Sequence, residues 1–135
     1  MNTSVDAERH TRATLRTGWI LTGIVIAFLV GDCIGTLVGI APVKRATLEI
    51  GYSLELLPLI GALQLICLVL YVIPATCVFG AIVLTGLLGG AIASHLRVAA
   101  ALTPEMTVSL ALAVLAWGGL SFRDPRLRAL IPRRR

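Results

Sequence analysis

The distribution of charge along this 135-residue chain constrains its fold more than any other feature. Only seven of the 106 residues from Thr17 to Phe122 carry a formal charge, whereas twelve charged residues lie in the two flanking segments. A soluble domain has roughly 25% charged residues, and this long interior cannot supply a surface of that kind. The pattern excludes a soluble enzyme, a nucleic-acid domain and a disordered chain, and it predicts an integral membrane protein.

Four apolar segments in this interior are each about long enough to cross a bilayer as an α-helix, which takes about 20 residues. The predicted spans cover residues 17–41, 56–73, 77–96 and 104–122. Open strands are excluded inside lipid because their backbone groups would lack hydrogen-bond partners. The sequence therefore predicts an all-α protein, an integral membrane four-helix bundle.

Local sequence features mark two of the span ends. Thr103 is a suitable N-cap, Pro104 suits the first helical position, and Glu105 lies where the helix dipole favours an anion. The segment from Pro74 to Thr76 is short enough to predict a tight connection. The second and third spans should therefore form an antiparallel hairpin.

Basic residues predict the orientation of the bundle. Residues 1–16 and 123–135 are expected to be tails outside the membrane, and together they hold nine arginines. The two loops on the opposite side hold only Lys44, Arg45 and Arg97. The positive-inside rule then places both termini in the cytoplasm, with the protein in the cell membrane. Topology and anionic lipid account for the arginine-rich tail, so no nucleic-acid partner is expected.

Glycines recur at four-residue spacing in two of the predicted spans. One stripe consists of Gly31, Gly35 and Gly39, and the other contains Gly86 and Gly90. Small residues at this spacing let helix backbones approach closely in lipid. We therefore expect these glycines to pack helices together, within one bundle or between copies of the chain.

Polar residues deep in the spans are the candidate functional residues. Asp32 and Gln64 lie at similar predicted depths, so the two side chains are expected to meet across the bundle. A carboxylate in hydrocarbon costs several kcal/mol unless it is paired, so Asp32 is either a proton-handling acid or a structural acid bonded to Gln64 or Thr36. His95 lies at the outer end of the third span.

The outer ends of the spans predict a polar mouth. Ser94, His95 and Glu55 are expected to line it, although His95 also suits an interfacial anchor. His10 and His95 lie on opposite sides of the membrane, so no shared metal is expected. The candidate catalytic residues are accordingly Asp32, Gln64 and His95.

Several short stretches of the chain are similar to the DoxX-like family of membrane proteins. They are GYS at 51–53, LVLYVIP at 68–74, GA at 80–81 followed by GLLGGAIASHLR at 86–97, and WGGLSFRDPRLRAL at 117–130. The resemblance covers about residues 18–132 and implies a small four-helix membrane fold. It also implies an association with membrane redox complexes and a quinone as cofactor.

The chain departs from the pattern of that family at several polar positions. Relatives usually carry a lysine four residues after the aspartate of the first span, where this chain has Thr36, and a glutamate where it has Gln64. Ser53 and Ala75 replace a proline and an arginine. The loss of the lysine leaves Asp32 without its expected cation, and we therefore expect Asp32 to be neutral at pH 7.

Three functions remain open from the sequence. The resemblance favours an accessory subunit of a quinone-linked membrane redox complex, which requires a partner protein. The deep polar residues favour a small membrane-embedded enzyme that acts on a lipophilic molecule, with Asp32 as general acid and Gln64 or His95 orienting the substrate. The glycine stripes favour a homo-oligomeric structural bundle.

Overall fold

The apolar segments form helices with bounds close to those expected. The structure, a computed structural model, describes residues 3–99, 102–123 and 127. Its helices are α1 (Thr3–Val38), α2 (Ala41–Glu49), the short 3-10 helix η1 (Leu54–Leu56), α3 (Leu57–Val72), α4 (Cys77–Val98) and α5 (Pro104–Arg123). Within α1 and in α4, α5 and the segment that joins η1 to α3, there are four stretches long and apolar enough to cross a membrane. The prediction of an all-α, four-span bundle is confirmed.

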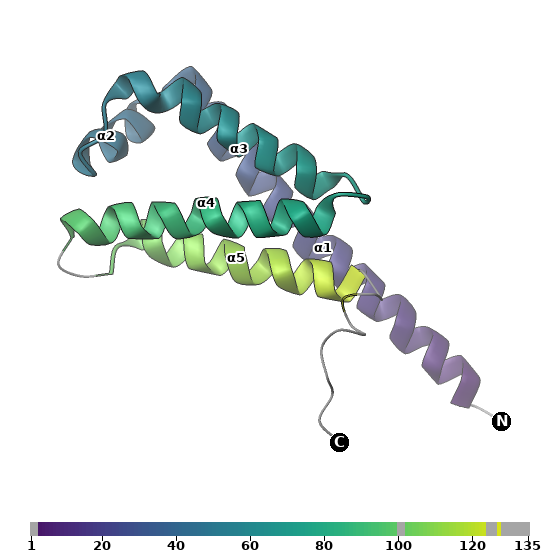
Figure 1. Cartoon of the computed structure of the whole chain (residues 1–135). Helices are drawn as coiled ribbons and strands as arrows, with labels where there is room; N and C mark the ends of the chain where they lie inside the picture. Colours follow the sequence, from purple (N-terminus) through teal and green to yellow (C-terminus); the bar gives the residue numbers. More distant parts are fainter. Residues whose placement is uncertain (1–2, 100–101, 124–126, 128–135) are drawn as a thin grey trace.

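The first helix differs most from its predicted bounds. Residues 3–16, expected to form a tail, continue α1 without a break, and the purple N-terminal part of the helix extends past the end of the bundle (Figure 1). At its other end α1 stops at Val38 rather than residue 41, because Gly39 adopts a left-handed backbone conformation with φ of 68°. The predicted arginine-rich tail, residues 123–135, lies almost wholly outside the described residues.

The amphipathic helix α2 was not predicted. Its start follows from Pro42, which lies in the first turn, where a missing backbone N–H costs nothing. Beyond its end, Gly51 adopts φ of 80° and turns the chain toward η1. Two left-handed glycines therefore flank a segment that the sequence analysis treated as a plain loop.

The four long helices form a ring in which each contacts two neighbours. Helix α1 packs on α3 and α5, and α4 packs on the same two helices. The tight connection between α3 and α4 is confirmed, and Thr76 fixes it by donating from Oγ1 to the Leu70 carbonyl at 2.9 Å. At the same end of the bundle, the Arg123 guanidinium of α5 lies 4.8 Å from the ring centroid of Trp19 on α1. This favourable cation–π contact joins the first and last helices.

Close helix contact is concentrated at the end of the bundle that holds the connection between α3 and α4. A methyl group at Gly80 would lie 2.6 Å from the Cα atom of Tyr71, and one at Gly119 would lie 3.0 Å from the Thr22 amide nitrogen. Only glycine allows the backbones to come this near. Figure 1 shows α3 and α4 diverging from this end toward the end that α2 occupies.

Large apolar side chains cover the outside of the bundle. In the most apolar stretch of each spanning helix only 28–33% of the residues are buried inside the protein. Ile20, Leu59 and Val114 are among the exposed residues, at 58–65% exposure. Such a surface is stable in hydrocarbon and would aggregate in water, so the protein is a multi-pass membrane protein. The core within the ring is small and includes Val25, Tyr71, Leu84 and Leu120.

Candidate functional site

A cavity of about 660 Å³ opens where the helices diverge, at the end of the bundle that α2 covers. Its volume falls in the range of small-molecule sites, about 300–1,000 Å³. Every long helix contributes to its wall, and α2 contributes Val43, Ala46 and Thr47. Apolar side chains make up most of the lining, and among them are Phe28, Leu87, Leu88, Val108 and Leu112.

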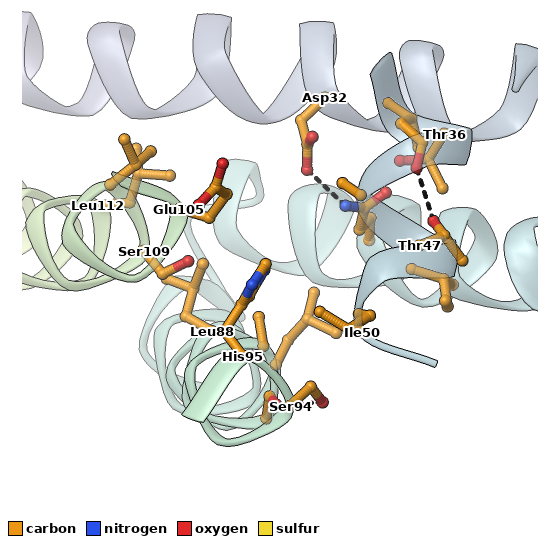
Figure 2. A pocket seen from close by; sticks show the side chains of 18 of the residues that line it. Asp32, Thr36, Thr47, Ile50, Leu88, Ser94, His95, Glu105, Ser109 and Leu112 are labelled. Atoms are coloured by element: carbon orange, nitrogen blue, oxygen red, sulfur yellow. Dashed lines mark hydrogen bonds between the residues drawn. The ribbon is translucent and has the colours of Figure 1, made fainter. Parts of the chain in front are cut away.

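Asp32 and Gln64 meet inside this cavity, as their similar depth had predicted. Gln64 Nε2 donates to Asp32 Oδ2 at 2.5 Å, which joins α1 to α3 (Figure 2). Thr36, the other expected partner of Asp32, is buried on the cavity wall one turn further along α1. The pair therefore places a carboxyl group and an amide side by side within a mostly apolar pocket.

The other end of the Gln64 amide is unsatisfied. Its Oε1 atom is buried and accepts no hydrogen bond from any residue that the structure describes. A buried carbonyl without a partner costs about 1–3 kcal/mol, and Gln64 belongs to the cavity lining. The site thus contains a buried hydrogen-bond acceptor that lacks a partner among the described residues.

His95, the third candidate residue, lies on the opposite side of the cavity, on α4. Figure 2 shows it beside Leu88 and Ser94, across the cavity from Asp32. Among the described residues no hydrogen bond joins His95 to Asp32 or Gln64, so the three candidates share one cavity without forming one hydrogen-bonded group. The catalytic roles expected for them stay predictions.

The mouth of the cavity is held by polar contacts between α4 and the segment around α2. The Tyr52 hydroxyl lies 2.8 Å from Ser94 Oγ, and Ser94 donates to the Gly90 carbonyl at 2.9 Å. Arg97 Nη2 donates to the Ile50 carbonyl at 2.8 Å. Ser94 and His95 line the cavity as expected, whereas Glu55 does not. Glu55 lies on η1, the short helix that directly precedes α3.

Glu105 is the site residue that sequence reasoning missed. It was assigned only to the first turn of the fourth span, yet it lines the cavity from α5 as an exposed side chain, together with Ser109 one turn later (Figure 2). The available signal was its position at the outer end of a span, the same property that singled out His95. Asp32 and Glu105 give the lining two acidic groups, and no lysine or arginine lies among the lining residues.

The predicted glycine stripes have mixed surroundings. Gly86 and Gly90 line the cavity, and a methyl group at either would meet no atom within 4 Å, as is also true of Gly31 and Gly89. Gly35 is close to Ile40, where an added methyl would lie 3.1 Å from Cδ1. Gly39 serves as the helix stop described above. The packing role expected for these glycines therefore stays a prediction. For the glycines with open space around them, that role would be in contacts between copies of the chain.

The fold and this site define a small multi-pass membrane protein with an intramembrane cavity that holds a carboxyl–amide pair. The sequence pattern of the DoxX-like family matches residues 20–119, which is most of the chain. The protein belongs to the DoxX-like family, and the suspected resemblance is confirmed. No curated protein and no solved structure matches it.

Proposed function

We propose that this protein binds a lipophilic small molecule in the cavity and serves as an accessory subunit of a membrane redox complex. The cavity is the observation that carries the proposal, because an open pocket of about 660 Å³ with mostly apolar walls and one polar pair has the size and lining of a small-molecule site. The redox association is what the resemblance to the DoxX-like family implies. The catalytic alternative, with Asp32 as general acid, uses the same cavity and needs an additional reactive group on the ligand.

A quinone, the cofactor implied by the family, would satisfy only part of the polar pair. Quinone carbonyls accept hydrogen bonds, whereas Gln64 Oε1 is itself an acceptor without a partner. A quinone head group beside it would leave that atom unsatisfied. The accessory role therefore places the quinone chemistry in the partner protein.

We further propose that both termini are cytoplasmic and that the cavity opens toward the outer side of the cell membrane. Lys44, Arg45 and Arg97 lie at the end of the bundle that α2 covers, opposite the start of α1. The nine arginines of the sequence segments 1–16 and 123–135, compared with these three basic residues, support this orientation. A ligand would then enter from the outer leaflet or the outer aqueous phase.

Cavity binding is tested with two leucine substitutions on neighbouring faces of α4. Both Gly86 and Gly89 have open space around them, but only Gly86 lines the cavity. The protein is reconstituted in nanodiscs and labelled with a long-chain alcohol that bears a photoreactive diazirine. We expect label on cavity peptides in the wild type and in Gly89→Leu, and its loss in Gly86→Leu. Equal labelling of both variants would contradict binding in this cavity.

The accessory role has a separate test, which is isolation of the tagged chain from its own membranes in a mild detergent. We expect a redox protein to co-purify in fixed stoichiometry and to be lost when the membranes are fully solubilised in a harsh detergent. Recovery of only the chain itself, alone or in multiples, would contradict the accessory role and leave the cavity proposal intact.

A further inference from the structure

The cavity is lined by acidic as well as apolar side chains, and this combination limits the chemical class of ligand that it can bind. Its ionisable side chains are the acids Asp32 and Glu105, together with Tyr52 and His95, and none is a lysine or arginine. Arg97 lies outside the lining, and its Nη2 atom is already bonded to the Ile50 carbonyl. Two carboxyl groups thus face the space with no fixed cation among the described lining residues to neutralise them.

The hydrogen-bonding groups of Asp32 and Gln64 also favour a ligand that carries a hydrogen-bond donor. Gln64 Oε1 has no partner, and Asp32 has a second carboxyl oxygen beyond the Oδ2 atom that accepts from Gln64. A primary amine has up to three N–H donors and no need for an acceptor once protonated. It would satisfy Gln64 Oε1 and Asp32 together, which neither a carbonyl nor an ether group can do.

From these contacts we infer that the ligand is a lipophilic primary amine whose nitrogen binds between Asp32 and Gln64. This inference rests on the proposed ligand-binding function and names its substrate class. The apolar wall formed by Phe28, Leu87 and Leu112 receives the hydrocarbon part. A neutral amine entering from the bilayer takes the proton of a protonated Asp32, which leaves an ammonium–carboxylate pair and releases no proton to solvent.

Charge assistance makes this head-group contact stronger than a neutral one. Hydrogen bonds to a charged partner are about twice as strong as neutral ones, and the attraction between an ammonium and a carboxylate is stronger in the low dielectric of the bundle than in water. The amine should therefore bind at least about tenfold more tightly than the alcohol of the same chain length. Asp32→Asn keeps an oxygen that can accept from Gln64 but removes the charge, so it should abolish most of that preference.

The test compares two diazirine-bearing probes that differ only in the head group, a long-chain primary alkylamine and the matching alcohol. The full chain in nanodiscs is titrated with each probe, and half-maximal labelling of cavity peptides is measured by mass spectrometry. We expect the amine to label at a concentration about tenfold lower than the alcohol in the wild type and in Gly89→Leu. In Asp32→Asn the two probes should label alike, with the alcohol unchanged.

Each outcome decides a different question. Equal labelling by both probes in the wild type, or an amine preference that survives in Asp32→Asn, would overturn the amine inference and leave cavity binding in place. Absence of cavity label with either probe would overturn the proposed binding function itself. Unchanged labelling of Asp32→Asn by the alcohol shows that the variant is folded, so that its loss of amine preference reports the head-group contact.

Discussion

The close approach of α3 and α4 at Gly80 should control the stability of the bundle, and a single methyl group tests it. An alanine Cβ there would lie 2.5 Å from the Leu70 carbonyl carbon and 2.6 Å from the Tyr71 Cα atom. Ordinary carbon–carbon contacts lie at about 3.5–4.0 Å. The atoms in the way belong to the backbone, so no side chain can rotate to relieve the overlap and the hairpin must open.

The size of the effect follows from two opposing terms. Overpacking costs typically about 1–3 kcal/mol, and the backbone contact at Gly80 places it near the upper end. Replacing a helical glycine by alanine gains about 1 kcal/mol from helix propensity. We therefore expect Gly80→Ala to lower the free energy of unfolding by about 2 kcal/mol. Gly86→Ala, with no atom within 4 Å of its Cβ, should raise it by about 1 kcal/mol.

Unfolding in mixed micelles of mild detergent and increasing sodium dodecyl sulfate measures the difference, with circular dichroism as the readout. We expect Gly80→Ala to be less stable and Gly86→Ala more stable than the wild type, so that the free energies of unfolding of the two variants differ by about 3 kcal/mol. Equal stability of Gly80→Ala and Gly86→Ala would show that the contact with the α3 backbone does not control stability, because an added methyl group overlaps that backbone at Gly80 and meets no atom at Gly86.

Three further predictions concern polar groups in the spans. In the ligand-free protein Asp32 should be protonated at pH 7, so infrared spectroscopy should show a protonated carboxyl band that Asp32→Asn lacks; an ionised carboxylate band lost in that variant would contradict this. Tyr71 is fully buried and donates to the Ala116 carbonyl at 3.0 Å, so Tyr71→Phe should cost about 1 kcal/mol of unfolding free energy, and an unchanged value would exclude a net contribution. Thr85 Oγ1 accepts from Trp117 Nε1 at 2.9 Å, so Thr85→Val should shift the tryptophan fluorescence spectrum, and an unshifted spectrum would argue against that bond.

The spanning helices could be predicted well from the sequence because lipid imposes a simple rule. An apolar segment long enough to cross the bilayer must be helical there. Pro104 and the turn from Pro74 to Thr76 mark helix ends in the sequence, and the helices of the structure end close to them. The start of α1 was missed because a charged helical extension beyond the membrane has no apolar signature. Its end was missed because the sequence does not show which glycine adopts the left-handed conformation, as Gly39 does here.

The polar pair could be predicted and the cavity could not. Asp32 and Gln64 were placed together by depth along two helices, a quantity that rise per residue supplies directly. The cavity depends on how far α3 and α4 diverge from their close contact at Gly80 (Figure 1). The sequence offers thirteen glycines and does not tell which of them contact a neighbouring backbone and which, like Gly86, face open space.

Helix α2 shows the same limit for loops. It is nine residues long, too short for its own helical tendency to decide its structure. Its position over the cavity depends on Gly39 and Gly51 at its flanks and on Arg97 reaching the Ile50 carbonyl. Glu105 was overlooked as a site residue for a related reason, since nothing in its own segment shows which side chains of other helices it faces.

Native mass spectrometry of the protein extracted gently from its own membranes tests the binding of a molecule in the cavity most directly. We expect the wild type and Gly89→Leu to be heavier than the chain alone by on the order of a few hundred daltons, and we expect Gly86→Leu to lack this added mass. An adduct that Gly86→Leu retains, or a wild-type chain found only as itself and its whole multiples, would contradict the claim that this cavity holds a small lipophilic molecule.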